Sequence, residues 1–301
     1  SVDESAAIGV KTEKSGGEDE VLVCIVKNKG DKIDNDKFLL FCQEKLPRFA
    51  VPKYIRYVES IRKTGSGKLS KVIDRVRADL EKDGCAIIRG FLSKEGVSEL
   101  IKETTDVAHL AHHSSALTNA YFTADDPSLP KSHPKRQFFE RSNAFIPADN
   151  FAKSGALRSI FDHEGFDEFI RACLNEPKDK FFRYADPLAD AIVNVSTEGY
   201  GFPWHFDTNN YTVTLAIQNA TEGGEFEYAP MIRHKDENFT EVSKVLKDQS
   251  QMVKSVVLQP GDLQLFKGRY SLHRVAPLKG SVPRYVAILS YVEEENMVGS
   301  V

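Results

Sequence analysis

The part of the chain from residue 190 onward constrains the fold most. Short β-rich runs alternate there with Gly and Pro, and these runs are AIVNVST, YTVTLAIQN, GEFEYA, SVVLQ, DLQLF and RYVAILSYV. Short strands at such regular spacing are typical of an antiparallel β-barrel or a double-sheet jelly roll. The sequence therefore predicts a mostly antiparallel β-domain at this end of the chain.

The beginning of the chain has a different pattern. Residues 20–59 predict a small α+β unit, in which the strand-like runs EVLVCIVKN and VPKYIRYVES flank the helical pattern DNDKFLLFCQEKL. The next stretch, RKTGSGKLSK, is expected to be a loop, and VIDRVRADLEKDG a helix that ends at Gly84. We therefore expect two domains, residues 1–75 and 76–301, which is also what a length of 301 residues favours.

Between these regions the pattern is mixed. CAIIRGFL predicts a strand, and Ser93 is the expected N-cap of the helix that follows. Residues 114–155 contain four prolines and are expected to form a loop-rich lid or wall. The run SIFDHEGFDEFIRACLN predicts one helix.

The composition excludes several classes of protein. Hydrophobic residues at 41%, charged residues at 28% and a net charge of -4 are ordinary for a globular protein and give no basis for nucleic-acid binding. The longest apolar runs are shorter than the roughly 20 residues that a membrane span needs, and no signal segment opens the chain. Four scattered cysteines without CxxC spacing predict reduced, mostly buried thiols. We expect a cytoplasmic protein with a small-molecule substrate and neither a nucleic-acid nor a membrane partner.

The run PWHFDTN contains a candidate metal-binding motif. His205 and Asp207 stand two residues apart after a turn-like GYGFP and before an alternating strand, and His273 follows sixty-six residues after Asp207. A lone His-x-Asp is weak evidence, but the PGD turn at residues 260–262 returns the chain, so His273 can meet the other two across a β-barrel. Two imidazoles and one carboxylate are the facial triad of non-haem Fe(II) oxygenases, which leaves three coordination positions open. The other six histidines are expected to be ordinary core or surface imidazoles.

Arg284 is the fourth residue of interest. It begins the strand-like run RYVAILSYV, where a period of two places it on one face with Val286 and Ile288. A guanidinium on an inward face needs an anionic partner and binds a carboxylate through two parallel hydrogen bonds. The alternative is a surface ion pair, which the position of Arg284 eleven residues after His273 disfavours.

These motifs resemble a known enzyme superfamily. From about Asp79 to the C-terminus the chain looks like an Fe(II)/2-oxoglutarate-dependent oxygenase, through LEKDGCAIIRGFLSKEGVSEL, WHFDTN, PGDLQLF, SLHRV and Arg284. The resemblance implies an α+β chain whose double-stranded β-helix (jelly roll) domain has flanking helices. It also implies that His205, Asp207 and His273 bind Fe(II), that Arg284 binds the distal carboxylate of 2-oxoglutarate, and that O2 is consumed.

Within this superfamily the chain is similar to the subgroup of free amino-acid halogenases and their hydroxylase relatives. The similarity lies in WHFDTNNYTVTL, GGEFEYAP and LFKGRYSLHRVAPL. Halogenases of this type have a small residue where the metal carboxylate would be, which opens a position for a halide. Because this chain keeps Asp207, we predict hydroxylation or another oxidative C–H transformation of a small amino-acid-like substrate, and not halogenation.

Three further residues are candidates for ligand binding. Asn194 lies on the strand that leads to the site and is assigned to 2-oxoglutarate, while Asn209 and Arg141 are assigned to the substrate, Arg141 through a substrate carboxylate. The alternatives are a turn-stabilising amide for Asn209 and an ion pair with Glu140 or another acid for Arg141.

The first domain resembles a different family. VPKYIRYVESIRKTGSGKLSK is similar to the C-terminal subdomain of acyl-CoA ligases and adenylation enzymes, which makes Lys68 the counterpart of their catalytic lysine. Arg62 stands where that family usually has proline, and a flexible basic loop is the alternative. Residues 1–26 look like the middle of the subdomain, so we expect a truncated ligase module with inactive chemistry and a larger ligase polypeptide upstream.

Three classes of function thus compete. The first is an Fe(II)/2-oxoglutarate oxygenase, the second is a fragment of an acyl-activating ligase with a non-catalytic tail, and the third is a silent barrel that serves as a binding module. The facial triad and Arg284 favour the first.

Overall fold

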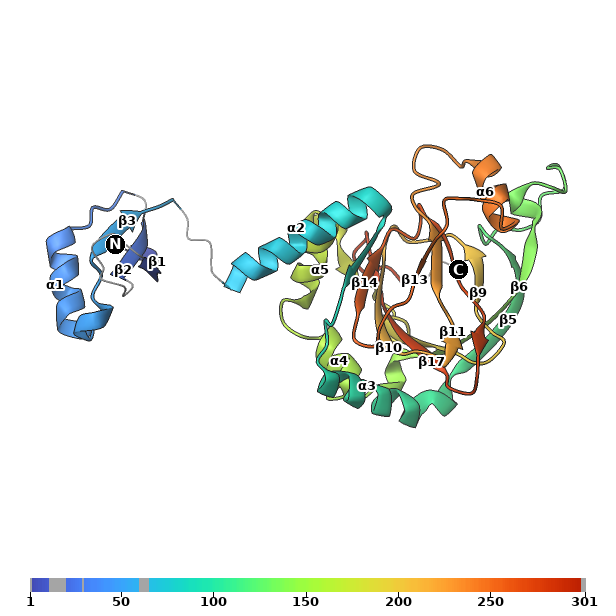
Figure 1. Cartoon of the computed structure of the whole chain (residues 1–301), viewed down its shortest axis with the longest axis horizontal. Coiled ribbons are helices and arrows are strands. Elements are labelled where there is room, and N and C mark those ends of the chain that lie inside the picture. Colours follow the sequence, from blue (N-terminus) through green and yellow to red (C-terminus); the bar gives the residue numbers. More distant parts are fainter. Residues whose placement is uncertain (1, 11–19, 29, 60–64, 299–301) are drawn as a thin grey trace. The chain divides into compact units, whose positions relative to one another are not determined.

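The computed structural model describes residues 2–10, 20–28, 30–59 and 65–298. The chain divides into two compact units, residues 1–71 and residues 72–301 (Figure 1). Helix α2 (Gly65–Asp83) contributes residues to both units.

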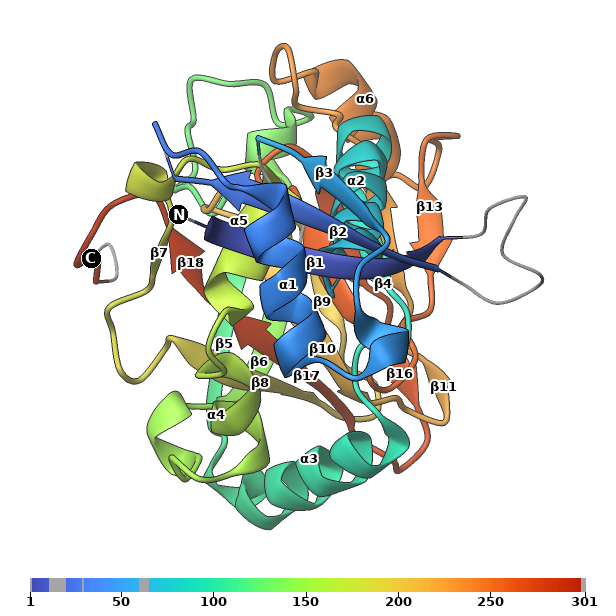
Figure 2. The same ribbon diagram turned by 90° about the vertical axis from the view of Figure 1, so that its left-hand side faces the viewer.

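The first unit is a three-stranded sheet with a helix on one face (Figure 2). Strand β1 (Val2–Val10) pairs antiparallel with β2 (Glu20–Lys27), and β2 pairs parallel with β3 (Tyr54–Tyr57). Helix α1 (Asn35–Lys45) has Asp34 as its N-cap, whose carboxylate accepts hydrogen bonds from two backbone amides of the first turn. The predicted strand–helix–strand order is confirmed, and β1 is an addition to it.

Two antiparallel sheets form the centre of the second unit. The larger sheet has the strand order β4-β14-β10-β17-β8-β6-β5, and the smaller one has the order β13-β12-β15-β9. The strands of the larger sheet are β4 (Cys85–Ile88), β5 (His112–Asn119), β6 (Phe138–Ile146), β8 (Ala191–Ser196), β10 (Thr212–Gln218), β14 (Leu263–Phe266) and β17 (Arg284–Leu289). Those of the smaller sheet are β9 (Phe202–His205), β12 (Phe226–Ala229), β13 (Lys254–Val256) and β15 (Leu272–Val275). Two short pairs join β11 (Glu222–Gly223) to β16 (Leu278–Lys279) and β7 (Phe182–Arg183) to β18 (Tyr291–Val292).

Helices cover the outer faces of these sheets (Figure 1). They are α3 (Lys94–Val107), α4 (Ala156–Phe161), α5 (Phe166–Leu174) and α6 (Phe239–Leu246). Short 3-10 turns in this unit are η2 (Ala108–Leu110), η3 (Pro134–Arg136), η4 (Ala148–Asn150) and η5 (Lys178–Lys180), whereas η1 (Arg48–Ala50) belongs to the first unit. Ser93 is the N-cap of α3, and its hydroxyl accepts a hydrogen bond from the Gly96 amide at 3.2 Å, so the predicted N-cap is confirmed.

Helix side chains and the larger sheet share one apolar core. Its buried members include Leu80 of α2, Leu100 of α3, Phe161 of α4 and Ile170 of α5. They pack with strand residues of the larger sheet, among them Val193, Leu215, Leu265 and Ala287. A second cluster packs α6 against the smaller sheet through Val242, Val245, Trp204 and Leu272. Burial of these apolar faces stabilises the packing of helices on the two sheets, since each Å² of apolar area removed from water contributes roughly 25 cal/mol of free energy.

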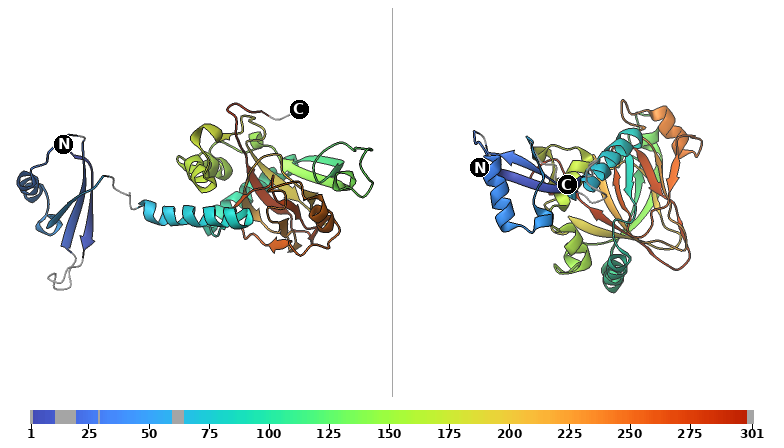
Figure 3. Two further views of the ribbon diagram at one scale, coloured as in Figure 1. Left: turned by 90° about the horizontal axis from the view of Figure 1, so that it is seen from above. Right: turned by 60° about the vertical axis from the view of Figure 1, so that its left-hand side comes forward.

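Three expectations about secondary structure were wrong. Helix α2 begins at Gly65, inside the stretch expected to be a loop, because the apolar spacing of residues 72, 73 and 76 extends back to Leu69. Residues 114–155 contain the hairpin β5–β6, and their prolines lie outside both strands, three of them in the connection that extends from the sheet (Figure 3). The single helix expected over residues 159–175 is divided into α4 and α5, because Gly165 adopts a left-handed φ of 84°.

All four cysteines are unpaired, and Cys42, Cys85 and Cys173 are buried, as expected. Among the described residues, no helix combines the length and apolar character needed to cross a membrane.

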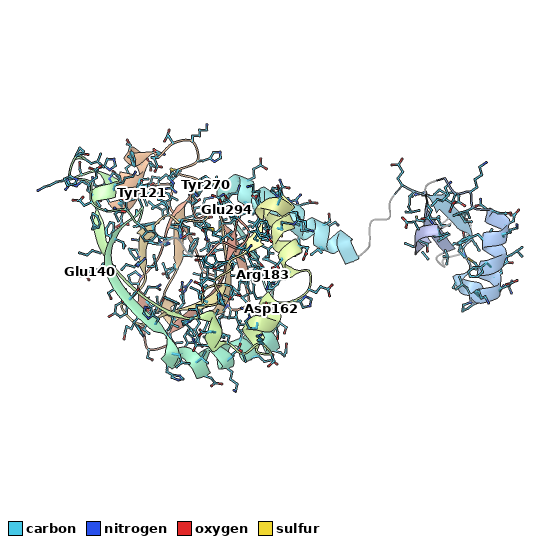
Figure 4. The ribbon with its side chains drawn as sticks, turned by 180° about the vertical axis from the view of Figure 1, so that it is seen from behind. Tyr121, Glu140, Asp162, Arg183, Tyr270 and Glu294 are labelled. Atoms are coloured by element: carbon cyan, nitrogen blue, oxygen red, sulfur yellow. The ribbon has the colours of Figure 1, made fainter. Side chains whose placement is uncertain are left out.

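An ion-pair network anchors β7 and β18 to helices α4 and α5. Arg183 Nη1 donates to Asp162 at 2.6 Å, and Figure 4 shows these two side chains beside each other. Arg183 Nε donates to Asp167 Oδ2 at 2.8 Å, and the buried Tyr291 hydroxyl donates to Asp167 Oδ1 at 2.8 Å. Asp167 therefore serves two donors at once.

The Asp167→Ala variant should lower the free energy of unfolding by about 1–3 kcal/mol, since it leaves a buried hydroxyl without an acceptor. Urea unfolding followed by circular dichroism measures this loss. Asp106→Ala, which removes only an exposed pair with Lys102, is the matched control and should unfold like the wild type. Equal urea midpoints for Asp167→Ala and the wild type would contradict the role of the network.

Candidate metal centre

Strand pairing brings the two distant histidines together. His205 ends β9, His273 lies on β15, and the two residues are direct partners in the antiparallel register of the smaller sheet. Their ring centroids are 4.0 Å apart. Asp207 follows β9 by two residues, and its backbone amide donates to the Gly268 carbonyl oxygen at 3.1 Å.

The three side chains present donor atoms to one point. Asp207 Oδ1 lies 3.4 Å from Nε2 of His205 and 3.4 Å from Nε2 of His273, and all three ligand atoms are within 4.8 Å of one another. Metal–nitrogen distances of about 2.1 Å place neighbouring donors on an octahedral face about 3 Å apart. The arrangement thus fits a divalent metal ion with small adjustments.

Hydrogen bonds fix the orientation of both imidazoles. Nδ1 of His205 bonds the Pro203 carbonyl oxygen, and Nδ1 of His273 bonds the Ser271 carbonyl oxygen, each at 2.9 Å. When Nδ1 carries the proton, Nε2 has a free lone pair, which is the tautomer a metal requires.

Burial and mutual charge set the protonation of the centre. His205 is 8% exposed, and burial, followed by the nearby His273, lowers its pKa. Burial alone would raise the pKa of Asp207, but His273 and His205 together hold it well below its ordinary value. A neutral imidazole and an ionised carboxylate are the forms that bind metal.

A cavity of about 240 Å³ opens beside the three side chains, between the two sheets. Arg284 lines it, is 8% exposed, and has no ion pair or hydrogen bond to any residue that the structure describes. Burial lowers the pKa of Arg284 to about 10, so the guanidinium remains charged at neutral pH. A buried cation without a partner costs several kcal/mol, which an anionic ligand in the cavity would offset.

Polar groups surround this cation. Ser196 is its register partner on β8, and Asn194, on the same strand, has a buried Oδ1 with no hydrogen-bond partner among the described residues. Thr214 Oγ1 on β10 donates to Gln264 Oε1 on β14 at 3.0 Å, and both residues line the cavity from the same sheet as Arg284. The cavity therefore combines a cation with small hydrogen-bonding groups, which suits a carboxylate ligand.

A second pocket of about 260 Å³ shares His205 and Asp207 with the first and contains Arg141 and Asn209. The Arg141 guanidinium lies over the rings of Phe122 and Phe202, 5.5 and 5.8 Å from their centroids. Its Nε is buried without a hydrogen-bond partner, and within the described ranges Arg141 forms no ion pair with Glu140. The Asn209 side chain likewise makes no turn-stabilising hydrogen bond to a described residue.

Two residues that contact Asp207 were not predicted from the sequence. Thr212 Oγ1 donates to Asp207 Oδ2, and Gly268 lies against the same carboxylate. The alternation of Thr212 and Thr214 on an inward strand face was a signal for the first. No local pattern marked Gly268.

The predicted ligase lysine, Lys68, belongs to the other unit, and its side chain lies outside the described residues.

The two units are similar to different known proteins. A sequence model of the AMP-binding enzyme C-terminal domain matches residues 1–68. Medium-chain acyl-CoA ligase ACSF2 from Mus musculus is 36% identical over 70 residues, which are 23% of this chain and 11% of that protein. Probable CoA ligase CCL9 from Humulus lupulus is 33% identical over 70 residues, 23% of this chain and 13% of that one. The chain thus spans about a tenth of the length of the curated relatives it matches.

Solved structures resemble the rest of the chain in fold. The non-heme alpha ketoglutarate dependent epimerase SnoN from nogalamycin biosynthesis aligns with a TM-score of 0.52 at 14% identity, over 74% of this chain and 82% of that one. AviO1 from Streptomyces viridochromogenes Tue57 aligns with a TM-score of 0.50 at 15% identity, over 75% and 95% of the two chains.

The decisive match is at the level of the family. A sequence model described as Halogenase D matches residues 69–300, which include every residue of the metal centre and both pockets. Both predicted resemblances are confirmed: one to the Fe(II)/2-oxoglutarate-dependent oxygenase superfamily with its halogenase subgroup, the other to the ligase subdomain. Because the match covers most of the chain, the protein belongs to the Halogenase D family.

Proposed function

We propose that the protein is an Fe(II)- and 2-oxoglutarate-dependent dioxygenase that hydroxylates a small amino-acid-like substrate. His205, Asp207 and His273 hold the metal, and the two sheets around them form the double-stranded β-helix of such enzymes. The family description would equally allow halogenation. The choice between the two reactions depends on one ligand position.

The observation that carries the proposal is the place of the Asp207 carboxylate. Its Oδ1 is 3.4 Å from Nε2 of each histidine, so an oxygen of this chain fills the third position of the triad. Halogenases of this type need that position for a halide. A retained carboxylate therefore supports oxygen insertion.

Arg284 holds 2-oxoglutarate in the proposed enzyme. Its guanidinium, which has no anionic partner in the described chain, pairs with the distal carboxylate, and the Asn194 side-chain amide donates a hydrogen bond to 2-oxoglutarate through Nδ2. When bound, iron supplies the oxidising chemistry, in which O2 and 2-oxoglutarate yield succinate and CO2 while one oxygen atom enters the substrate. The apolar walls of the cavity, among them Phe226, Phe266 and Val286, exclude water from this reaction.

The substrate occupies the second pocket, with Arg141 on its carboxylate and Asn209 nearby. The Arg141→Gln variant should raise the KM for substrate by roughly 10- to 150-fold, because a hydrogen bond to a charged group contributes about 1.5–3 kcal/mol. Its Kd for 2-oxoglutarate should not change. Steady-state kinetics and calorimetry measure the two constants.

Glu140→Gln is the matched control for this variant. Glu140, which is labelled in Figure 4, neighbours Arg141 on β6 but lines a different pocket together with Trp204 and Arg274. We expect wild-type kinetics from it. An unchanged substrate KM in Arg141→Gln would show that the substrate binds elsewhere.

The reaction itself can be tested with free amino acids. The protein is incubated with Fe(II), 2-oxoglutarate and O2 in a chloride-containing buffer, and products are analysed by mass spectrometry. The proposal predicts a product that has gained one oxygen atom. A product in which chlorine replaces hydrogen would overturn hydroxylation and retain the metal site.

The ligase-like unit is proposed to be catalytically inactive in this chain. The ligase-domain model matches residues 1–68, and the ligases that align with this part of the chain are far longer. The alternative, an active ligase fragment, predicts ATP–pyrophosphate exchange that depends on Lys68. Absence of exchange under conditions where 2-oxoglutarate is consumed supports the oxygenase.

A further inference from the structure

We propose that Thr212 is a positioning residue which, together with Gly268, restricts Asp207 to one metal-binding oxygen and so keeps one coordination position open. The inference rests on the proposed metal site. It concerns the second oxygen of the carboxylate, which the assignment of the triad leaves without a role.

The two oxygens of Asp207 have different surroundings. Oδ1 faces Nε2 of both histidines, whereas Oδ2 accepts a hydrogen bond from the Thr212 hydroxyl. Thr212 is the first residue of β10, and its backbone position is fixed by pairing with Phe266 on β14. The hydroxyl is therefore held by the sheet and does not follow the carboxylate if it turns.

Gly268 lies against the same carboxylate, with Oδ2 as its nearest atom. A Cβ at this position would lie 2.9 Å from Asp207 Cβ and 2.5 Å from Asp207 Cγ, so only glycine allows the approach. The turn is also bound to the segment after β9: the Asp207 amide donates to the Gly268 carbonyl at 3.1 Å, and Arg269 Nη1 donates to the Thr208 carbonyl at 3.2 Å. A hydrogen bond from Thr212 and the close approach of Gly268 thus both limit rotation of the carboxylate.

The number of donor atoms at the metal gives this restriction a chemical consequence. An octahedral ion has six positions, of which the triad takes three when the carboxylate binds through one oxygen. A 2-oxoglutarate chelate takes two more and leaves one for O2. A carboxylate that binds through both oxygens fills the last position, and the Thr212 hydrogen bond opposes this by occupying Oδ2.

The test uses the full chain loaded with Mn(II) and 2-oxoglutarate without O2. Water-proton relaxation reports whether Mn(II) retains an exchangeable water, which requires an open coordination position. We expect a strong relaxation enhancement in the wild type and in Thr212→Ser, which keeps the hydroxyl. In Thr212→Val, which has the same shape without the hydroxyl, the enhancement should fall at least twofold, while calorimetry shows that Mn(II) and 2-oxoglutarate still bind.

A second variant tests the contact between Gly268 and Asp207. Gly268→Ala should weaken Mn(II) binding at least tenfold, because the added methyl displaces the carboxylate. Gly96→Ala, where a Cβ meets its nearest neighbour at an ordinary 3.7 Å, is the matched control and should bind like the wild type. Wild-type relaxation in Thr212→Val would overturn the inference and leave the proposed function intact. Failure of the wild type to bind Mn(II) and 2-oxoglutarate would overturn both.

Discussion

The His205→Ala variant is expected to lose Fe(II)-dependent conversion of 2-oxoglutarate to succinate, and its affinity for divalent metal should fall at least 100-fold. Loss of a hydrogen bond to a metal ligand already costs about 10- to 100-fold in affinity, so loss of the ligand itself must cost more. Nε2 of His205 is one of two nitrogens 3.4 Å from Asp207 Oδ1, and none of the described His, Cys, Asp or Glu side chains forms another such group.

Metal titration by calorimetry and succinate formation by chromatography measure these two losses. His234→Ala is the control, because His234 is an exposed residue that packs near Tyr270 outside the metal centre. It should retain both properties. Turnover at the wild-type rate in His205→Ala would exclude the facial triad as the metal site.

The Arg284→Met variant should raise the Kd for 2-oxoglutarate by roughly 30- to 4,000-fold. Removal of one partner of a buried, hydrogen-bonded charge pair costs about 2–5 kcal/mol, and each 1.4 kcal/mol is a factor of ten. Arg284→Lys keeps the charge but cannot form two parallel hydrogen bonds, so its Kd should lie between those of the wild type and Arg284→Met.

The Arg284→Met variant should also change the stability of the ligand-free protein, in the opposite direction. Without ligand, the buried Arg284 has no partner in the described chain, so methionine removes a desolvated charge and should raise the melting temperature of the ligand-free protein. The rise in melting temperature that 2-oxoglutarate gives the wild type should be absent. Wild-type affinity for 2-oxoglutarate in Arg284→Met would contradict the assigned role.

The strands and the positions of the triad could be predicted from local sequence. Runs such as YTVTLAIQN and RYVAILSYV combine β-branched residues with turn residues at their ends, and both are strands of the larger sheet. The turn at residues 260–262 indicated that the chain reverses before His273. In the structure this reversal leads to β14 and then to β15, where His273 pairs with His205.

The hairpin β5–β6 could not be predicted for a physical reason. Strand β5 has the sequence HHSSALTN and lies at the edge of the larger sheet, where a strand needs little apolar character. Its polar residues and the nearby prolines resemble a loop. Pairing with β6 determines its structure, and that pairing is a tertiary property.

The contacts of Asp207 could not be predicted from the sequence for a similar reason. Gly268 is sixty-one residues from Asp207, and their approach depends on the register between β9 and β15 and on the turn that precedes β15. A sequence pattern identifies residues that share a strand face. It does not identify which residue of a distant turn will lie against them.

The central claim, that the triad holds Fe(II) with 2-oxoglutarate beside Arg284, is tested most directly by an anaerobic titration. Fe(II)-loaded wild-type protein is titrated with 2-oxoglutarate while the visible absorption is recorded, since chelation of Fe(II) by the 2-oxo acid produces a charge-transfer band. We predict that the band appears and saturates at a stoichiometric amount of 2-oxoglutarate, and that it is lost in His205→Ala. An Fe(II)-loaded wild type that develops no band at saturating 2-oxoglutarate would contradict the account.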